Sequence, residues 1–430
     1  MRAASEEYSL EHQKYIKLFA KISIFILALV FLLLPGILRE DEQVIGDKPY
    51  YHLNREGEFS GVGPGWNFLL KYFPMNILLP IIGLLSAFFI FLNLKMLKLE
   101  ERLLITGFFV ISPAFVYLFS VGERFGISFL FTLIACYFLL DKKYLFAGIS
   151  VVFVSLFDIW IGVFVATIML LYFLFKYNKG KIFYSLIIVF FLLTIILGDF
   201  NPGIISDLGA KVGSSVFAIL FVAFSFLFFW NRKKFISLYA IAGLLFLFSL
   251  KVEFGIFYFS LFLSILVGLC FFELLRIRWE SKLVRDLILL IFVCGLLFSG
   301  LSYTNRISKD KPDDVFFNAL NRLPDGAVVF SDMGYGNWIT YGGKKNVWHS
   351  FMSREEAEII SKDLSIVLES KDYAKTTEVF EKYQVDYILL DSELKQKWHE
   401  SELVYLLKYD SEGFRFLFEE NGIEVWRFFR

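Results

Sequence analysis

Apolar stretches of about twenty residues recur along the first 300 residues of the chain. In a bilayer each backbone N–H and C=O must be hydrogen-bonded within the protein, so such a stretch spans the hydrocarbon core as a helix. The sequence therefore predicts a polytopic α-helical membrane protein with about eleven transmembrane helices. The windows lie at about 16–37, 74–96, 103–121, 125–140, 144–157, 159–175, 182–198, 215–230, 235–250, 254–275 and 284–302.

The loops between these windows alternate in their content of Lys and Arg. Basic residues concentrate in one set of loops, whereas the other set is poor in them and holds Glu123, Asp158 and Asp207. Because basic loops stay on the cytoplasmic side, the alternation predicts a cytoplasmic N-terminus and an extracytoplasmic C-terminal domain in the cell membrane. The basic loops contain Lys14/Lys17/Lys21, Lys95/Lys98/Arg102, Lys142/Lys143, Lys176/Lys179/Lys181, Arg232/Lys233/Lys234 and Arg276/Arg278/Lys282/Arg285.

The charge distribution changes near residue 304. Residues 1–303 hold 26 basic and 20 acidic side chains, and residues 304–430 hold 17 and 23. The second segment is also patterned as α/β, with strands expected at 326–331 and 385–390 and helices near 313–322, 354–370 and 372–384. We therefore expect a transmembrane domain over 1–303 and a soluble α/β domain over 304–430.

The composition excludes several classes of protein. Hydrophobic residues make up 57% of the chain and charged residues only 20%, which a disordered polymer or a single soluble globule does not show. The net charge is zero and no basic region stands apart, so nucleic acid is not an expected partner. Cys136, Cys270 and Cys294 all lie in apolar windows and predict no disulfide.

Polar residues that suit chemistry gather in the loops expected outside. Asp47 and His52 follow the first window and are competent ligands for a divalent cation, although a solvated loop with interfacial tyrosines gives the same pattern. Glu123 and Arg124 lie between the third and fourth windows, where a short polar turn also needs charge. Asp207 belongs to a loop, 199–208, that is too long for a simple hairpin.

Two further places have the composition of a binding surface. The segment 331–339 follows an expected strand and contains Asp332, Tyr335 and Trp338, with glycines that permit close backbone approach. It also fits an ordinary turn. Lys251 lies at the outer edge of the window 254–275, where a long side chain can simply extend toward the membrane surface.

The order of these segments resembles the GT-C class of membrane glycosyltransferases, and within it the catalytic subunit of oligosaccharyltransferase in its short archaeal and bacterial forms. Segment 47–52, Asp-Lys-Pro-Tyr-Tyr-His, resembles the acidic and aromatic motif of the family's first outside loop. Segment 204–207, Ile-Ile-Ser-Asp, is similar to its later Ser/Thr-Ile/Val-x-Glu motif, with Asp in place of Glu. Segments 330–339 and 383–391 resemble its Trp-Trp-Asp-Tyr-Gly region and its Val-Asp-Tyr-Val strand.

The sequence departs from the family pattern at several positions. Phe330 and Ser331 stand where the family has two tryptophans, and Met333 and Gly334 lengthen the spacing from Asp to Tyr. The second acidic motif is reduced to Glu123-Arg124, and about eleven spans are expected where the family usually has about thirteen.

The resemblance implies transfer of a glycan from a polyprenyl-(pyro)phosphate donor to an acceptor, with protein asparagine as the acceptor. It implies catalytic roles for Asp47 and Asp207, and a divalent cation, Mn²⁺ or Mg²⁺, on Asp47, Glu123, Asp207 and His52. Phosphate binding falls to Arg124 and Arg55, and acceptor binding to Asp332, Tyr335, Trp338 and Lys251. The implied partners are the lipid-linked donor, a polypeptide or glycan acceptor and membrane lipids.

Two alternatives remain open from the sequence. One is a GT-C transferase that uses a polyprenyl-phosphate monosaccharide and a lipid or glycan acceptor. Another is a non-catalytic membrane protein with a GT-C-like helical domain. A transporter is disfavoured because such folds usually carry internal repeats, and no convincing repeat is present in this chain.

Overall fold

The computed structural model describes residues 2–39, 41, 43–56, 63–176, 203–348, 354–369, 373–397, 402–409 and 412–429. The chain divides into two compact units, of which the first contains residues 1–40 and 57–309 and the second contains residues 41–56 and 310–430. The boundary expected from the sequence lay between residues 303 and 304. Segment 41–56, which follows the first helix, groups with the C-terminal residues.

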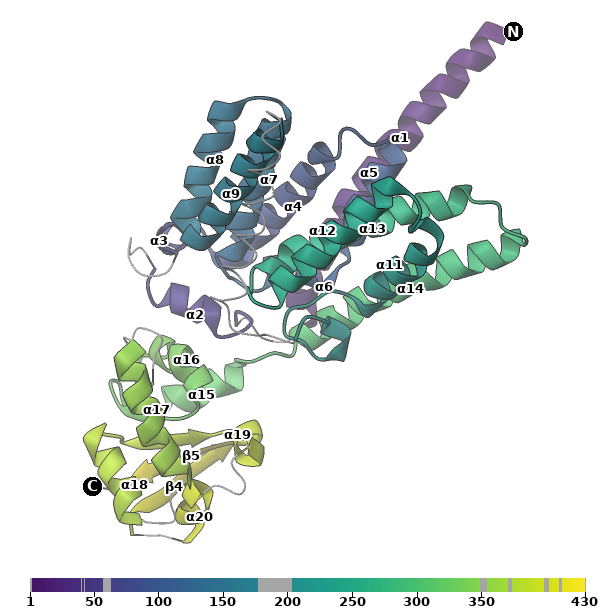
Figure 1. Ribbon diagram of the computed structural model, residues 1–430. Coiled ribbons are helices and arrows are strands. Elements are labelled where there is room, and N and C mark those ends of the chain that lie inside the picture. The colour runs from purple at the N-terminus through teal and green to yellow at the C-terminus, as the bar shows by residue number, and fades with distance from the viewer. Residues whose placement is uncertain are drawn as a thin grey trace. The chain divides into compact units, whose positions relative to one another are not determined.

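The first unit is helical in the part that the structure describes, and each of ten of the eleven expected spans coincides with one helix or with a broken pair (Figure 1). The expected span 182–198 lies outside the described residues. The helices of this unit are α1 (Arg2–Leu38), α3 (Pro64–Leu70), α4 (Met75–Asn93), α5 (Leu99–Val110), α6 (Pro113–Ser120), α7 (Phe125–Leu140), α8 (Tyr144–Phe157), α9 (Ile159–Lys176), η1 (Ser206–Leu208), α11 (Val216–Phe229), α12 (Lys233–Ser249), α13 (Gly255–Arg276) and α14 (Lys282–Ile307).

Four described helices are long and apolar enough to cross a membrane by themselves: α1, α4, α13 and α14. The pair α5–α6 makes a fifth span if its two parts are counted together. The other apolar helices contain only 10 to 17 suitable residues each, fewer than the roughly 20 that cross the hydrocarbon core perpendicular to the bilayer. The chain is thus an integral membrane protein, while the count of eleven spans and the orientation of its termini stay predictions.

The expected continuous span 103–121 is broken. Helices α5 and α6 meet at 63° across Ile111-Ser112, because Pro113 has no N–H to donate to the preceding turn. Ser112 caps the new helix by accepting a hydrogen bond from Phe115 N at 3.3 Å. Helix α14 approaches this break so closely that a Cβ on Gly300 would lie 2.1 Å from the Ile111 carbonyl oxygen.

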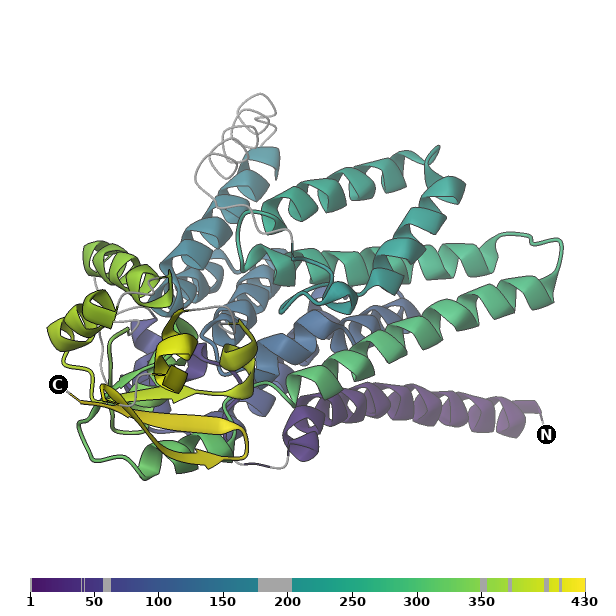
Figure 2. The same cartoon turned by 90° about the horizontal axis from the view of Figure 1, so that it is seen from below.

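Some helices of the first unit pack against their neighbours in sequence, and others pack against helices that are distant in sequence. Helices α7, α8 and α9 pack as consecutive antiparallel neighbours, whereas α13 packs against α5, α11 and α12. Helix α14 contacts α1, α6 and α11, and Figure 2 shows α1 and α14 running side by side. Helix α14 therefore packs against both α1 and α11, which are distant in sequence.

The second unit is an α/β domain with a five-stranded sheet of order β2-β1-β3-β5-β4. Strand β1 runs parallel to β2 and β3, and β5 is antiparallel to β3 and β4. Helices α17 to α20 lie around this sheet (Figure 1). The elements are α2 (Lys48–Leu53), α15 (Asp314–Asn321), β1 (Val328–Phe330), η2 (Met333–Tyr335), α16 (Gly336–Tyr341), β2 (Lys345–Asn346), α17 (Arg354–Glu369), α18 (Tyr373–Lys382), β3 (Tyr387–Leu390), α19 (Ser392–Lys397), α20 (Glu402–Tyr409), β4 (Phe414–Glu420) and β5 (Ile423–Phe428).

Both strands and all three helices expected in this unit are present, and the structure adds the hairpin β4–β5. Its turn is Asn421-Gly422, with φ of 46° and 88°, the pair of residues that most readily adopts two successive left-handed conformations. Tyr50 from segment 41–56 belongs to the same hydrophobic core, where it is 1% exposed. The core of the second unit is therefore built from two distant parts of the chain.

The close approach of α14 to the α5–α6 break gives a test of this packing. We expect Gly300→Ala to destabilise the protein by about 1–3 kcal/mol, because the added methyl group needs a shift of the Ile111 backbone. Thermal unfolding in detergent, followed by intrinsic fluorescence, measures this. Gly148→Ala is the matched control, since a Cβ there meets nothing within 4 Å. Equal Tm values for the two variants would contradict the close approach.

Candidate functional site

Asp47 is held by the C-terminal part of the second unit. The Asn337 side chain donates a hydrogen bond from Nδ2 to Asp47 Oδ2 at 3.0 Å, and Trp338 Nε1 donates to the Gly46 carbonyl at 3.1 Å. Asn54 at the end of α2 donates in turn to the Asn337 carbonyl at 3.0 Å. The structure therefore brings Asp47 and Trp338 of the expected site residues together, through neighbours that the sequence did not single out.

His52 and Arg55 follow Asp47 on the same short helical segment. His52 is 1% exposed, and its ring packs edge-on against Tyr51. The Arg55 guanidinium carbon lies 5.5 Å from the centre of the Tyr51 ring, a cation–π distance. The three side chains are therefore ordered by local aromatic packing.

Tyr335 and Trp338 belong to the hydrophobic core of the second unit. They are 7% and 5% exposed, their rings stack at 4.7 Å, and both pack edge-on against Phe316. Asp332 begins the turn that leads to them, where its Oδ1 accepts a hydrogen bond from Gly334 N at 2.8 Å. The expected acceptor segment is thus mostly helical and packed, and the acceptor-binding role of these residues stays a proposal.

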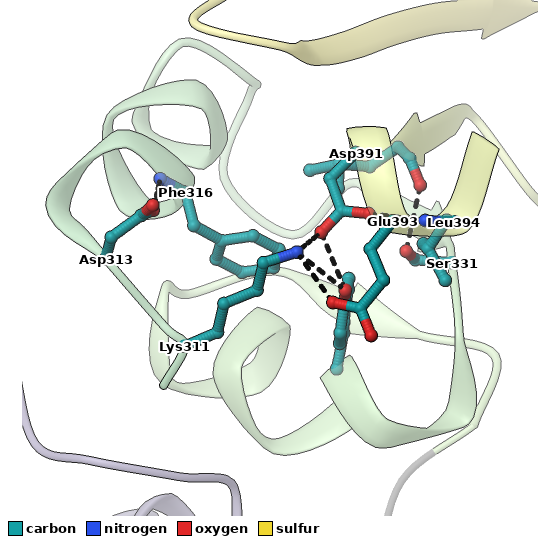
Figure 3. Close-up of polar contacts among 9 residues, drawn as sticks. Lys311, Asp313, Phe316, Ser331, Asp391, Glu393 and Leu394 are labelled. Atoms are coloured by element: carbon teal, nitrogen blue, oxygen red, sulfur yellow. Dashed lines mark hydrogen bonds and ion pairs between the residues drawn. The ribbon is translucent and has the colours of Figure 1, made fainter. Parts of the chain in front are cut away.

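A cluster of charged residues that the sequence did not single out lies beside Tyr335. Lys311 forms ion pairs with Asp391 and, at 3.2 Å, with Glu393 (Figure 3). Tyr335 Oη donates to Asp391 Oδ2 at 2.7 Å, and Leu394 N donates to its Oδ1 at 2.7 Å. Asp391 comes directly after β3, at the carboxyl end of a strand that runs parallel to β1. Its position after an expected strand is the feature of the sequence that could have identified it.

The surroundings of Asp391 set its charge state. Burial of the carboxyl group would by itself raise the pKa of Asp391, but hydrogen bonds from Lys311, Leu394 N and Tyr335 outweigh burial and hold this pKa below its usual value. Burial and the neighbouring Asp391 raise the pKa of Tyr335. The cluster is therefore ionised at neutral pH as a Lys–carboxylate pair with a neutral tyrosine, which fastens the start of the second unit to its sheet.

In the first unit, Glu123 and Arg124 face different partners. Tyr117 Oη donates to Glu123 Oε1 at 2.6 Å, and Glu123 is 3% exposed. Arg124 Nε forms an ion pair with Asp158 Oδ2 at 2.8 Å. Asp158 Oδ1 also accepts from Trp160 N at 2.9 Å and so caps α9. Asp158 is the partner that sequence reasoning missed, although its place between two apolar windows was visible.

Asp207 lies in a folded loop, residues 203–215, that is fixed at both carboxylate oxygens. Ser299 Oγ donates to Asp207 Oδ1 and Val216 N donates to Oδ2, each at 2.6 Å. The loop closes on itself through Ser214 N and the Ile204 carbonyl at 2.8 Å. Asp207 is nevertheless exposed, so its outer surface remains accessible to a ligand.

Helix α14 supplies further contacts that hold this loop. Tyr303 Oη donates to the Lys211 carbonyl at 2.6 Å, and Arg306 donates to the carbonyls of Ser206 and Ala210 at 2.8 and 2.7 Å. Residues 299, 303 and 306 share one face of the helix because they are spaced by four and three. The loop geometry around Asp207 thus depends on the last turns of α14.

The remaining candidate, Lys251, lies in the turn between α12 and α13, where it is half-buried. Among the described residues, no three His, Cys, Asp or Glu side chains are close enough together to hold a metal ion. Asp47 and His52 belong to the second unit, and Glu123 and Asp207 to the first. The carboxylate oxygens of Asp47, Glu123 and Asp207 and the imidazole nitrogen of His52 are donor types that bind Mg²⁺ or Mn²⁺, and the assignment of a cation to them stays a proposal.

Comparison with solved structures identifies proteins of the same architecture. Archaeal oligosaccharyltransferase AglB from Archaeoglobus fulgidus, solved with an inhibitory peptide and a dolichol-phosphate, matches 97% of this chain and 75% of its own, at 12% identity and a TM-score of 0.59. The chain has the fold of this archaeal oligosaccharyltransferase. The resemblance found in the sequence is thereby confirmed at the level of the fold.

Further structures support the oligosaccharyltransferase fold. The A. fulgidus enzyme tethered to an acceptor peptide with an NVT sequon matches 95% of this chain and 74% of its own at 12% identity, with a TM-score of 0.59. Its complex with zinc and sulfate matches 86% and 68% at 13% identity, with a TM-score of 0.55. Arabinofuranosyltransferase AftD from Mycobacteria matches 95% of this chain and 40% of its own at 9% identity, with a TM-score of 0.53. No protein-family model and no curated protein matches the sequence.

The ion pair of Lys311 with Asp391 gives a test of the second unit. We expect Lys311→Met to lower the free energy of unfolding by about 2 kcal/mol at pH 7, because a buried carboxylate then lacks its cation. A carboxyl group with a lowered pKa stabilises the folded state above its unfolded pKa of about 3.9 and loses that effect as the pH falls through its folded pKa. The difference from wild type should therefore shrink toward pH 3.

Thermal unfolding of the full chain in detergent at pH 7 and pH 3 measures this effect. Lys382→Met is the matched control, since Lys382 pairs with Asp363 at the surface, where an ion pair contributes about 0–1 kcal/mol. An equal loss of stability in the two variants at pH 7 would contradict the assigned role of Lys311.

The contacts of Arg306 give a test of the loop that carries Asp207. We expect Arg306→Met to increase deuterium uptake in residues 203–215 about tenfold, because two carbonyl groups of the loop lose their donor. Hydrogen exchange followed by mass spectrometry measures it on the intact protein. Arg276→Met, at the far end of α13, should leave the loop unchanged. Uptake equal to wild type in the Arg306 variant would show that Arg306 does not hold the loop.

Proposed function

We propose that the protein is a membrane glycosyltransferase that moves a glycan from a polyprenyl-(pyro)phosphate donor to an acceptor on the extracytoplasmic face. The observation that carries this proposal is the shared fold, which extends over 97% of the chain and over both of its units. The neighbour with this fold was solved with a dolichol-phosphate and a peptide. The corresponding substrates here are a lipid-linked sugar and, as the first choice of acceptor, a protein asparagine.

The proposed reaction depends on the carboxylates that the family resemblance implies as catalytic. In the reaction, the acceptor forms a bond to the anomeric carbon, the bond from that carbon to the phosphate oxygen breaks, and the acceptor proton leaves to a base. Asp47 and Asp207 are the proposed catalytic carboxylates. A divalent cation held by Asp47, Glu123, Asp207 and His52 would offset the charge that develops on the leaving phosphate.

Cationic side chains near these carboxylates are the proposed phosphate ligands. Arg55 is held over Tyr51 within the same segment as Asp47. The charge of Arg124 is already offset by Asp158, which weakens its attraction for phosphate. Arg55 and Arg124 are both kept as proposed phosphate ligands. The acceptor is proposed to meet Asp332, Tyr335, Trp338 and Lys251.

A second function is favoured by one comparison. The mycobacterial arabinofuranosyltransferase AftD matches 95% of this chain, although its own chain is much longer. A GT-C transferase that adds a single sugar to a glycan or lipid therefore fits the same fold. The reduced acidic motif at Glu123-Arg124 also keeps a non-catalytic protein of this fold in consideration.

The decisive experiment is a transfer assay with wild type and Asp47→Asn in native membranes. With a radiolabelled lipid-linked glycan and a peptide containing Asn-x-Thr, we expect labelled glycopeptide from wild type and a loss of about a hundredfold or more in the variant. Glu56→Gln, an exposed carboxylate in the same segment, is the matched control. Chelation of divalent cations should abolish transfer by wild type.

The alternatives give different outcomes. Label on a glycan or lipid acceptor, with none on peptide, would replace the asparagine acceptor with the second function. Transfer that proceeds equally in Asp47→Asn or after chelation would contradict the proposed mechanism.

A further inference from the structure

A cavity of about 180 Å³ lies in the first unit between the loop 203–212 and the turn that joins α12 to α13. Its walls include Ile204, Lys211, Val212, Ser249, Glu253 and Ile256. A cavity of about 150 Å³ holds one six-membered ring of the size of benzene. The space therefore suits a single ring with a few substituents.

The charged groups that line this cavity are of both signs and are exposed. Lys211 and Glu253 both line it, so an anion meets the carboxylate and a simple cation meets the ammonium group. The two groups together add no net charge to the wall, whereas each supplies strong hydrogen bonds to a neutral polar group. A hydroxyl-bearing neutral group can use both as partners, because it donates to Glu253 and accepts from Lys211, whereas an unprotonated phosphate can use only Lys211.

The rest of the wall combines polar and apolar surface. Ser249 Oγ donates a hydrogen bond to the Phe246 carbonyl at 2.7 Å, and its oxygen keeps the capacity to accept. Ile204, Val212 and Ile256 add apolar surface. A sugar ring presents hydroxyl groups around its rim and C–H bonds on its faces, so both kinds of surface find a counterpart on it.

One wall of the cavity is fixed before any ligand binds. The backbone at Lys211 is held by Tyr303 through its carbonyl at 2.6 Å, and Ile204 is held by Ser214 at 2.8 Å. Arg306 holds Ala210 beside it. A wall that is already ordered saves the entropy of ordering it on binding, and this favours weakly interacting ligands such as sugars.

We propose that this cavity binds one neutral sugar ring, which belongs either to the lipid-linked donor or to a glycan acceptor. The inference rests on the proposed glycosyl transfer, and it adds a sugar-binding subsite formed by Lys211, Ser249 and Glu253. Glu253 and Lys211 accept and donate hydrogen bonds at the rim of the ring, while the apolar side chains contact its face.

Binding is tested directly on the full chain in detergent micelles by saturation-transfer NMR. The probes are methyl α-D-glucopyranoside, methyl α-D-mannopyranoside, methyl β-N-acetylglucosaminide and methyl α-D-arabinofuranoside, with inorganic phosphate as the charged comparison. We expect saturation transfer to at least one of the glycosides with wild type. Glu253→Gln should bind that glycoside about tenfold more weakly, and Ser249→Phe should not bind it because the larger side chain fills the cavity. Glu280→Gln, beyond the other end of α13, is the matched control and should bind as wild type does.

The source of the ring is resolved by kinetics of Glu253→Gln. A raised KM for the lipid-linked donor assigns the ring to the donor, and a raised KM for a glycan acceptor assigns it to the acceptor. The proposal is overturned if folded wild type binds none of the glycosides, or if Ser249→Phe and Glu253→Gln both bind them as wild type does. Glycoside binding without any glycosyl transfer would support the subsite and contradict the proposed function. Glycosyl transfer without glycoside binding would support the proposed function and contradict the subsite.

Discussion

A bilayer offers no water to an unpaired backbone amide, and this constraint governs where the protein can place irregular structure. In the described part of the first unit, the polar side chains of interest lie at helix ends and in connecting segments. Such segments must find hydrogen-bond partners of their own. Asp158 caps α9 while it binds Arg124, and residues of α14 bind the carbonyls around Asp207. The same contacts that satisfy the backbone hydrogen-bonding groups also orient the candidate functional side chains.

This arrangement explains why helix α14 matters beyond its length. Its middle packs against the break between α5 and α6 at Gly300, and its last turns hold the loop 203–215. The helix ends at Ile307, close in sequence to Lys311, which pairs with Asp391 in the second unit. One helix thus supports both a packed helix break and a polar loop, through two different types of contact.

Much of the fold was predictable because its signals are local. Runs of apolar residues located the helices, and apolar strands followed by turns located β1 and β3. The break at Ile111-Ser112 was not predicted, because hydropathy over 103–121 is uniform and only Pro113 marks the change. The hairpin β4–β5 was also missed, although Asn421-Gly422 is a strong local signal for it.

The candidate site was less predictable because its partners are distant in sequence. Asp47 was singled out from its motif, but Asn337, which binds it, follows 290 residues later. The partner of Arg124, Asp158, and the pair of Lys311 and Asp391 are likewise joined only by tertiary packing. Residue type and loop position suggested which side chains are candidates for a catalytic or binding role. They did not give the hydrogen bonds that decide how each is held.

The membership of segment 41–56 in the second unit has a consequence for biosynthesis. Asp47 leaves the ribosome long before Asn337 and Trp338, and at about 5–20 residues per second the interval is roughly 15–60 s. During that time Tyr50 has no hydrophobic core to enter. Segment 41–56 can therefore reach its native packing only after the later helices have been synthesised. Assembly around Asp47 is then among the last steps of folding.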